Sequence, residues 1–224
     1  MSWESVSWPE FEKVLREYRA KFFEGKPAEE KSYIRVMTEV EPREMRDRGD
    51  PKVIGAIVDF LNKWKCRFSM DAAVPALSEW VSLHGEDLQR FGDLAIDHEA
   101  VLQRIDQMVS LYTSLMDLKS WPNPKIHNMS DAAGSKILHV MRPRLFVMWD
   151  LNIKRHYPYG YRGFLEEMHR FAQRLNSIAP PDARRDAAGY LNRRLGYPIP
   201  KTLAKFIDEF NWHTEVGHAR VSYS

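Results

Sequence analysis

The sequence is nearly free of cysteine. Cys66 is the single cysteine among 224 residues, which excludes an internal disulfide, a thiolate zinc site and a four-cysteine iron–sulfur cluster. So little thiol chemistry indicates a reducing environment, and we expect a cytoplasmic protein. The eight histidines show no close ligand spacing, so we expect neither a metal site nor a cofactor.

Long apolar runs and the common catalytic signatures are also missing. No apolar run approaches the ~18 residues that a membrane-spanning helix needs, so we expect no membrane partner. Residues 1–19 lack a basic region followed by an apolar one and do not have the pattern of a secretory signal. A glycine-rich phosphate loop, a Ser-His-Asp order and an HExxH pattern are all absent, which argues against kinases, triad hydrolases and zincins.

Charge is present in quantity but is unevenly distributed. Hydrophobic residues make up 44% of the chain and charged residues 29%, with a net charge of +2, which is typical of a globular protein with a real core. From Lys119 onward there are 17 basic and 9 acidic residues, net +8, against 16 and 22 before it, net −6. We therefore divide the chain into an acidic helical lobe, 1–118, and a basic helical lobe, 119–224, or regard both as one continuous domain. The basic half favours a polyanion partner, and ordinary surface variation explains it equally well.

Apolar residues recur at intervals of three and four through almost the whole chain. This spacing predicts helices over about 8–24, from Asp50 onward, from Asp71 onward, over 98–118, over 163–175, after Asp182 and over 200–212. Residues 32–40 fit either a short strand or a helix, and 41–49 fit a linker or a short helix. With no internal repeat and no hairpin dipeptide, we predict an all-α, multi-helix globular fold in one or two lobes.

The stretch from Ser130 to Tyr157 carries the best candidates for chemistry. Ser130 is a credible N-cap, and Ala132, Ala133 and Gly134 leave the first helical turn with little side-chain bulk. Free amides at such a helix start can approach a phosphate closely. Ser135 and Lys136 follow one turn inside the helix. The apolar run 145–149 then leads to Asp150, which should cap a helix over 151–157.

Basic and aromatic residues are interleaved around this stretch. The basic positions closest to it are Arg142, Arg144, Lys154 and Arg155, and Tyr157, Tyr159 and Tyr161 lie just beyond. Cations meet phosphates and rings stack on bases, so this mixture suits a nucleic-acid surface.

The run Ala133-Gly134-Ser135-Lys136, followed by an apolar segment that ends at Trp149-Asp150, resembles the helix-hairpin-helix DNA glycosylase superfamily. In that superfamily a hairpin ends in Gly-x-Lys, and the chain then leads to an Asp at the start of a helix. The resemblance implies that Lys136 is a Schiff-base nucleophile and Asp150 a catalytic carboxylate, while the amides of 132–134 hold a DNA phosphate. It implies a DNA-repair enzyme, a glycosylase with lyase activity, acting on duplex DNA with a damaged or modified base.

The sequence departs from the family pattern at three points. Ala132 stands where the hairpin usually has its first glycine, and Ser130-Asp131 replace the usual Leu-Pro. The interval from Lys136 to Asp150 is 14 residues, about four shorter than the family pattern. Four residues are close to one helical turn of about 3.6, so a helix shorter by one turn would keep its facing.

The implied chemistry needs an activated amine and a pocket. A lysine that is partly shielded from water and lies near other cations is a better nucleophile, because its pKa falls. A target base must leave the stack to be read. Trp149, Phe146 and Trp121, with Trp212 as a further candidate, are the aromatic residues that could line such a base pocket.

Simpler interpretations stand beside each of these. Lys136 fits a solvent-facing helix lysine with its stem on the apolar face, and Asp150 fits a plain N-cap. The chain as a whole also fits a non-catalytic helical module that binds nucleic acid or protein, or a helical accessory protein that binds no nucleic acid. DNA binding that survives replacement of both residues would indicate the non-catalytic module.

Overall fold

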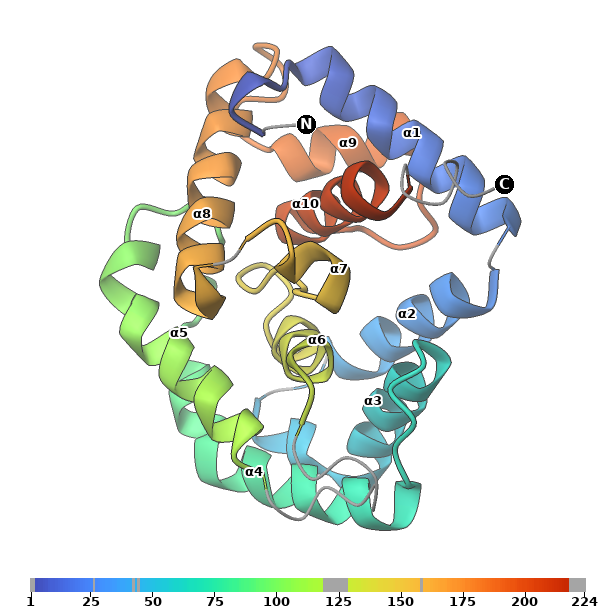
Figure 1. Cartoon of the computed structure of the whole chain (residues 1–224), viewed down its shortest axis with the longest axis vertical. Helices are drawn as coiled ribbons and strands as arrows, with labels where there is room; N and C mark the ends of the chain where they lie inside the picture. The colour runs from blue at the N-terminus through green and yellow to red at the C-terminus, as the bar shows by residue number, and fades with distance from the viewer. Residues whose placement is uncertain are drawn as a thin grey trace.

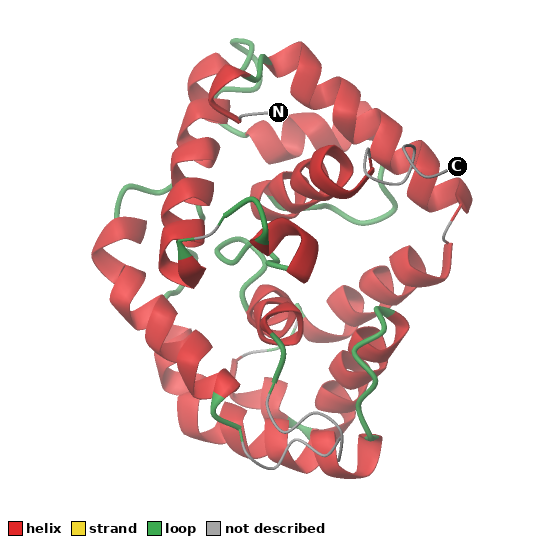
Figure 2. Ribbon diagram, in the orientation of Figure 1, coloured by secondary structure: helices red, strands yellow, loops and turns green. Residues whose placement is uncertain are grey.

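The fold is all-α, as predicted. The computed structural model describes residues 3–25, 27–41, 43, 45–118, 129–157 and 159–217, and within them there are ten α-helices and no strand (Figure 2). The helices are α1 Trp8–Gly25, α2 Pro27–Val40, α3 Pro51–Lys63, α4 Met70–Arg90, α5 Val101–Met116, α6 Asp131–Met141, α7 Leu151–Lys154, α8 Gly160–Ile178, α9 Ala187–Leu195 and α10 Leu203–Trp212. Two 3-10 turns (Trp3–Ser5 and Met45–Gly49) and a π turn (His213–Gly217) complete the regular structure.

Several helices begin where a side chain accepts a free amide of the first turn. Asp50 Oδ1 accepts the N–H of Lys52 at 2.8 Å, with a proline in the first turn of α3, as the sequence predicts. The start of α9 differs from the prediction. Asp186 rather than Asp182 caps this helix, because Asp186 Oδ1 accepts the N–H of Gly189 at 2.8 Å and residues 181–185 form turns.

The structure also defines the two segments for which the sequence left alternatives, 32–40 and 41–49, and the end of α7. Residues 32–40 lie in α2 and not in a strand, and the last five residues of 41–49 form a 3-10 turn. Helix α7 ends at Lys154, before the predicted end at Tyr157, and the chain turns there through the hydrogen bond from the N–H of His156 to the carbonyl of Ile153.

The first helix packs against the last ones. The ring of Phe11 in α1 lies 5.8 Å from that of Phe171 in α8 and 5.2 Å from that of Phe210 in α10. Figure 1 shows α1, α8 and α9 around α10, while α2 to α5 surround α6. The buried apolar residues form a single cluster, with members both before and after residue 118, the predicted boundary between the lobes.

Helix α7 and the segment before it lie between these two groups of helices. The buried run 145–149 leads from α6 to Asp150, and α7 packs against α10. Residues at the ends of α6 and α7 are thus placed where the two groups meet. In the part of the chain that is described, no helix is both long enough and apolar enough to cross a bilayer.

Candidate functional site

Ser135 ties the helix of Lys136 to the segment of Asp150. Its buried hydroxyl accepts the N–H of Trp149 at 2.9 Å and donates to the carbonyl of the same residue at 3.2 Å. Lys136 follows Ser135 and Asp150 follows Trp149. These two hydrogen bonds therefore fix the backbone positions of the two predicted catalytic residues relative to each other.

Asp150 caps α7, as predicted. Its Oδ1 accepts the amides of Asn152 at 2.9 Å and Ile153 at 3.0 Å. The residue is half-buried. The capping bonds hold the carboxylate at the end of the buried segment, next to the interior and still accessible to solvent.

Lys136 is an interior residue, so the prediction of a solvent-facing helix lysine is wrong. Only 5% of its surface is exposed. The ammonium lies 5.4 Å from the ring centroid of Trp64, the C-cap residue directly after α3. Within the described ranges, no carboxylate or other acceptor hydrogen-bonds or ion-pairs with this ammonium. A buried cation without a direct counter-ion is unusual, because desolvation penalises the charged form.

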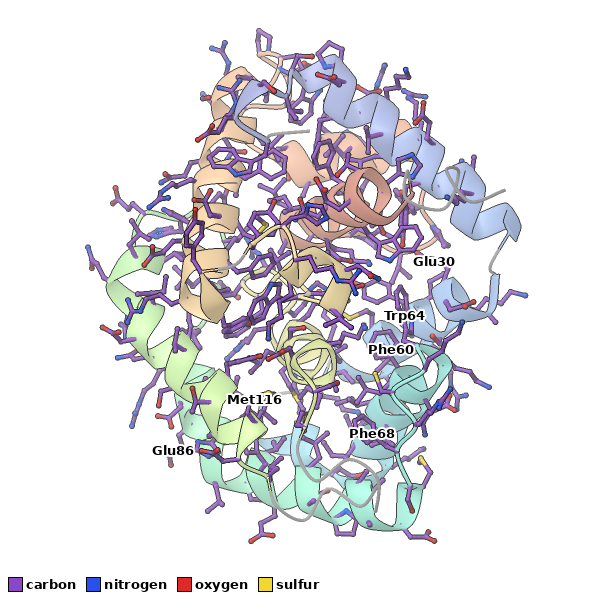
Figure 3. All side chains as sticks on the ribbon, in the orientation of Figure 1. Glu30, Phe60, Trp64, Phe68, Glu86 and Met116 are labelled. Atoms are coloured by element: carbon purple, nitrogen blue, oxygen red, sulfur yellow. The ribbon has the colours of Figure 1, made fainter. Side chains whose placement is uncertain are left out.

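A network of buried charges lies beside this lysine. Lys201 donates to Glu30 and to Glu209 Oε1, the latter at 2.5 Å, and both Lys201 and Glu209 are fully buried. Lys205 donates to Asp208 Oδ2 at 2.6 Å and lies 3.7 Å from Glu209 Oε1. Figure 3 shows Glu30 of α2, together with Trp64, on the side that faces the centre of the molecule.

The protonation of these groups reflects burial and the neighbouring charges. Burial raises the pKa of Asp208 against the opposing effect of Lys205, and Asp150 adds to the rise while Lys136 reduces it. Burial also raises the pKa of Glu209 against the opposing effect of Lys201. The pKa of Lys205 is raised, because the surrounding carboxylates outweigh the effect of burial on its ammonium.

Lys136 and Lys205 meet at the same aromatic ring. The ammonium of Lys205 lies 5.6 Å from the ring centroid of Trp64, close to the 5.4 Å of Lys136. Cys66 lies nearby: burial raises the pKa of its thiol, and the positive charge of Lys136 opposes that rise. Both ammonium groups thus lie within the range of a cation–π interaction with the same indole.

A buried, neutral histidine lies close enough to the network for the charge of Lys205 to affect its pKa. His139 Nδ1 lies 2.6 Å from the carbonyl oxygen of Phe146, so this nitrogen must donate. Nε2 then accepts from the hydroxyl of Tyr33 at 3.1 Å. Complete burial, together with the charge of Lys205, lowers the pKa of His139 to about 3.

The start of α6 holds the residues predicted to bind a DNA phosphate. Ser130 caps the helix: its carbonyl accepts the amides of Ala133 and Gly134 at 2.9 and 3.0 Å, and its hydroxyl accepts from Ala133 at 3.3 Å. Ala132 is half-buried, and the side chain of Met116 (labelled in Figure 3) covers Gly134. The amides of Ala133 and Gly134 are therefore already hydrogen-bonded within the protein.

A carboxylate also lies at this helix start. Asp131 accepts from the hydroxyl of Tyr112 and from the ammonium of Lys154, the latter at 2.6 Å. Burial tends to raise the pKa of Asp131, but these two donors outweigh it and the pKa is lowered. A phosphate approaching here would meet a negative charge, with Lys154 already paired.

The other predicted DNA contacts differ in how accessible they are. Arg142 is half-buried and its Nε donates to the carbonyl of Leu88 at 2.7 Å, with burial lowering its pKa. Arg144 and Arg155 are exposed. These two side chains remain in position to meet a polyanion from solvent.

The predicted base pocket is not open at its aromatic residues. Phe146 and Trp149 are 0% and 2% exposed, and the Trp149 ring stacks on Phe164 at 5.6 Å. A base cannot stack on rings that the core encloses on both faces. Trp121 lies outside the described residues. Trp212 is half-buried against Tyr18, with ring centroids 6.1 Å apart.

The sequence interpretation missed Trp64 and the charged residues of α10. The sequence did contain a signal that the charged residues of α10 are buried. Apolar residues leave no polar face between Leu203 and Phe210, so a charged residue in that helix must be buried. Trp64 gave no such signal, since an aromatic residue at a helix end usually belongs to the core.

Metal binding and relatedness give no further assignment. Among the described residues, no group of three or more His, Cys, Asp or Glu side chains is arranged to hold a metal ion. Comparison with protein-family models, with curated proteins and with solved structures finds no match to this chain.

Proposed function

We propose that the protein is a DNA base-excision glycosylase with lyase activity, in which Lys136 is the nucleophile and Asp150 the carboxylate. The observation that supports this proposal most directly is the environment of Lys136. Its amine is 5% exposed, lies against Trp64 and lacks a direct acidic partner among the described residues. Lysines that only support the fold are usually exposed or paired with a carboxylate. An unpaired interior amine is what nucleophilic catalysis needs.

The two side chains have separate roles in this proposal. The free amine of Lys136 attacks the anomeric carbon of a nucleotide that has left the stack, and the base departs. Asp150, held by its two amide bonds, stabilises the positive charge that develops on the sugar. Ser135 keeps the two residues in register through its bonds to Trp149.

The test compares the wild type with Lys136→Gln and Asp150→Asn on labelled duplexes. Each duplex in the panel carries one lesion, which is a deaminated base, an oxidised base, an alkylated base or an abasic site. An undamaged duplex is the control. We expect the wild type to release a base or cleave at the abasic site. Lys136→Gln should bind each duplex within about twofold of the wild type and lose at least about 100-fold in rate. Equal rates in all three proteins would contradict the proposal.

A non-catalytic nucleic-acid-binding module is the second candidate. The exposed side chains of Arg144 and Arg155 favour it, because they can meet a polyanion from solvent without any chemistry at Lys136. It predicts salt-dependent DNA binding that survives both Lys136→Gln and Asp150→Asn, with no base release from any duplex.

A further inference from the structure

Three arginines line one small cavity beside the end of α6. They are Arg48, from the 3-10 turn Met45–Gly49, and Arg142 and Arg144, from the segment that follows α6. The cavity has a volume of about 270 Å³, and residues 92–94 after α4 form part of its wall. This volume lies just below the ~300–1,000 Å³ of sites that enclose whole small molecules. The cavity therefore fits a small ligand or one group of a larger ligand.

Arg48 is held in this wall by backbone carbonyls. Its Nε donates to the carbonyl of Arg43 at 3.0 Å and its Nη2 to that of Glu41 at 3.1 Å, while Nη1 donates to the carbonyl of Met141. Only 7% of the residue is exposed. A guanidinium has five N–H donors, so these three bonds fix its position. They leave two donors without a protein acceptor in the described part of the chain.

Arg142 is fixed in a similar way. Its Nε donates to the carbonyl of Leu88, in the last turn of α4, at 2.7 Å. Neither of its terminal nitrogens bonds an acceptor within the described ranges. The carbonyl that Nη1 of Arg48 bonds belongs to Met141, directly before Arg142. The two guanidinium groups are thus anchored next to each other, with donors to spare on both.

The charges of these two arginines are not neutralised by a direct partner. Burial, together with the charge of Arg142, lowers the pKa of Arg48 to about 10, against the opposing effect of Glu41. Burial also lowers the pKa of Arg142, against the opposing effect of Asp93. Among the described residues, neither acid forms an ion pair with either arginine. Because buried cations are usually paired, a bound anion would relieve both the repulsion and the desolvation.

Arg144 supplies the accessible cation of the cavity. Its side chain is exposed and bonds no acceptor in the described ranges, whereas its carbonyl accepts the N–H of Ile96 at 2.9 Å and so fixes its backbone. With Glu41 and Asp93 counted, the wall carries three positive and two negative charges, net +1. Arg144 and Glu41 also line an adjoining cavity of about 350 Å³. That cavity leaves room for the body of a ligand whose anionic group lies among the arginines.

We propose that this cavity is a binding site for a phosphoryl group, held by Arg48, Arg142 and Arg144. Guanidinium groups bind phosphate through paired, charge-assisted hydrogen bonds. A phosphate has oxygens for three guanidinium groups, whereas a carboxylate has only two oxygens. The burial of Arg48 favours a terminal phosphoryl group, on a free phosphate compound or at the end of a DNA strand, over one inside a duplex. Lys136 lines neither cavity, so the site goes beyond the proposed glycosylase activity and does not depend on it.

Calorimetric titration of the full chain with inorganic phosphate, at constant ionic strength, tests the site. The wild type should bind phosphate saturably. Arg144→Gln should weaken this binding by about tenfold or more, because it removes a charge-assisted hydrogen bond. Arg142→Lys should weaken it by a similar factor, since an ammonium keeps the charge and loses the planar fork. Arg193→Gln is the matched control: Arg193 is exposed on α9 and lines neither cavity, and its replacement should leave the affinity unchanged.

Two undamaged single strands of the same sequence identify the source of the phosphoryl group, without any base release. A 5′-phosphorylated strand that binds at least about tenfold more tightly than its 5′-hydroxyl counterpart would identify a DNA end as the ligand. Equal binding of the two strands, with saturable binding of inorganic phosphate, would assign the site to a free phosphate compound.

The Arg144→Gln arm decides the inference if Arg142→Lys does not fold, because the Arg144 side chain makes no hydrogen bond with the described residues. Two results would overturn the inference. One is a wild type that binds neither inorganic phosphate nor the phosphorylated strand in preference to the hydroxyl strand. The other is an affinity for phosphate or for that strand that stays the same in Arg144→Gln.

Discussion

At the scale of single residues, the hydroxyl of Ser135 holds the candidate site together. It bonds both the N–H and the carbonyl of Trp149 inside the core. The sequence showed Ser135 only as part of a small-residue helix start. Its partner is 14 residues away, and a contact across that distance depends on how the chain folds back after α6. For this reason the N-cap role of Asp150 could be predicted from pattern, whereas its link to the helix of Lys136 could not.

Ser135→Ala should destabilise the protein by about 1–3 kcal/mol, because it leaves two buried backbone groups of Trp149 without a partner. Urea unfolding measures this change. Ser177→Ala is the matched control, since Ser177 is exposed and bonds only within its own helix, and it should stay within about 0.5 kcal/mol of the wild type. Equal effects of the two substitutions would show that the Ser135 bonds do not hold the segment.

His139 should make stability fall with acid. Its folded pKa of about 3 lies below the unfolded value of about 6.5, so the unfolded state takes up the proton first. Its contribution is therefore complete above pH 6.5 and is lost as the pH falls toward 3. Between pH 7 and 5, the free energy of unfolding of the wild type should drop about 2 kcal/mol more than that of His139→Gln. Parallel pH profiles would contradict a buried neutral imidazole.

At the scale of elements, most helices could be predicted because their signals are local. Two N-cap patterns indicate helix starts directly from the sequence: Asp50 with the following proline at the start of α3, and Ser130 at the start of α6. The predicted start of α9 was wrong because Asp182 and Asp186 are equivalent N-cap signals in the sequence. Asp186 is the cap in the structure, since its side chain reaches Gly189.

Helix α10 shows the limit of local patterns. Its apolar positions correctly predicted burial, and the charged residues between them are buried as well. Lys205 pairs with Asp208 within α10, whereas Glu209 pairs with Lys201 of the preceding segment, which also binds Glu30 of α2. A charge in such a helix can be predicted to be buried, but its counter-ion depends on packing between distant parts of the chain.

Lys201→Met should therefore be severely destabilising, by about 3–5 kcal/mol, because it leaves Glu30 buried without its cation and Glu209 with only the more distant Lys205. Lys13→Met provides the comparison: Lys13 is 74% exposed and lies 3.8 Å from Glu17, and its loss should cost less than about 1 kcal/mol. Guanidinium unfolding at neutral pH measures both variants. Similar midpoints for the two would refute the view that the α10 network stabilises the junction with α2.

At the scale of the whole molecule, α1 packs with the C-terminal helices while α2 to α6 form the other group (Figure 1). Lys136 comes from one group and Asp208 from the other, with Asp150 on the connecting segment. Charge and composition could not predict this arrangement, because they describe the halves of the chain and not which helices pack together. The aromatic candidates failed for the same reason, since Phe146 and Trp149 lie in the core and Trp64 lies beside the amine.

The most direct test of the account is borohydride trapping on a duplex that carries an abasic site. Borohydride reduces the imine formed by an attacking amine and so records the nucleophile as a permanent link to DNA. The account predicts an adduct with the wild type, a modified peptide that contains Lys136, and no adduct with Lys136→Gln. An adduct that persists in Lys136→Gln, or its absence from a wild type that binds the same DNA, would contradict the central claim.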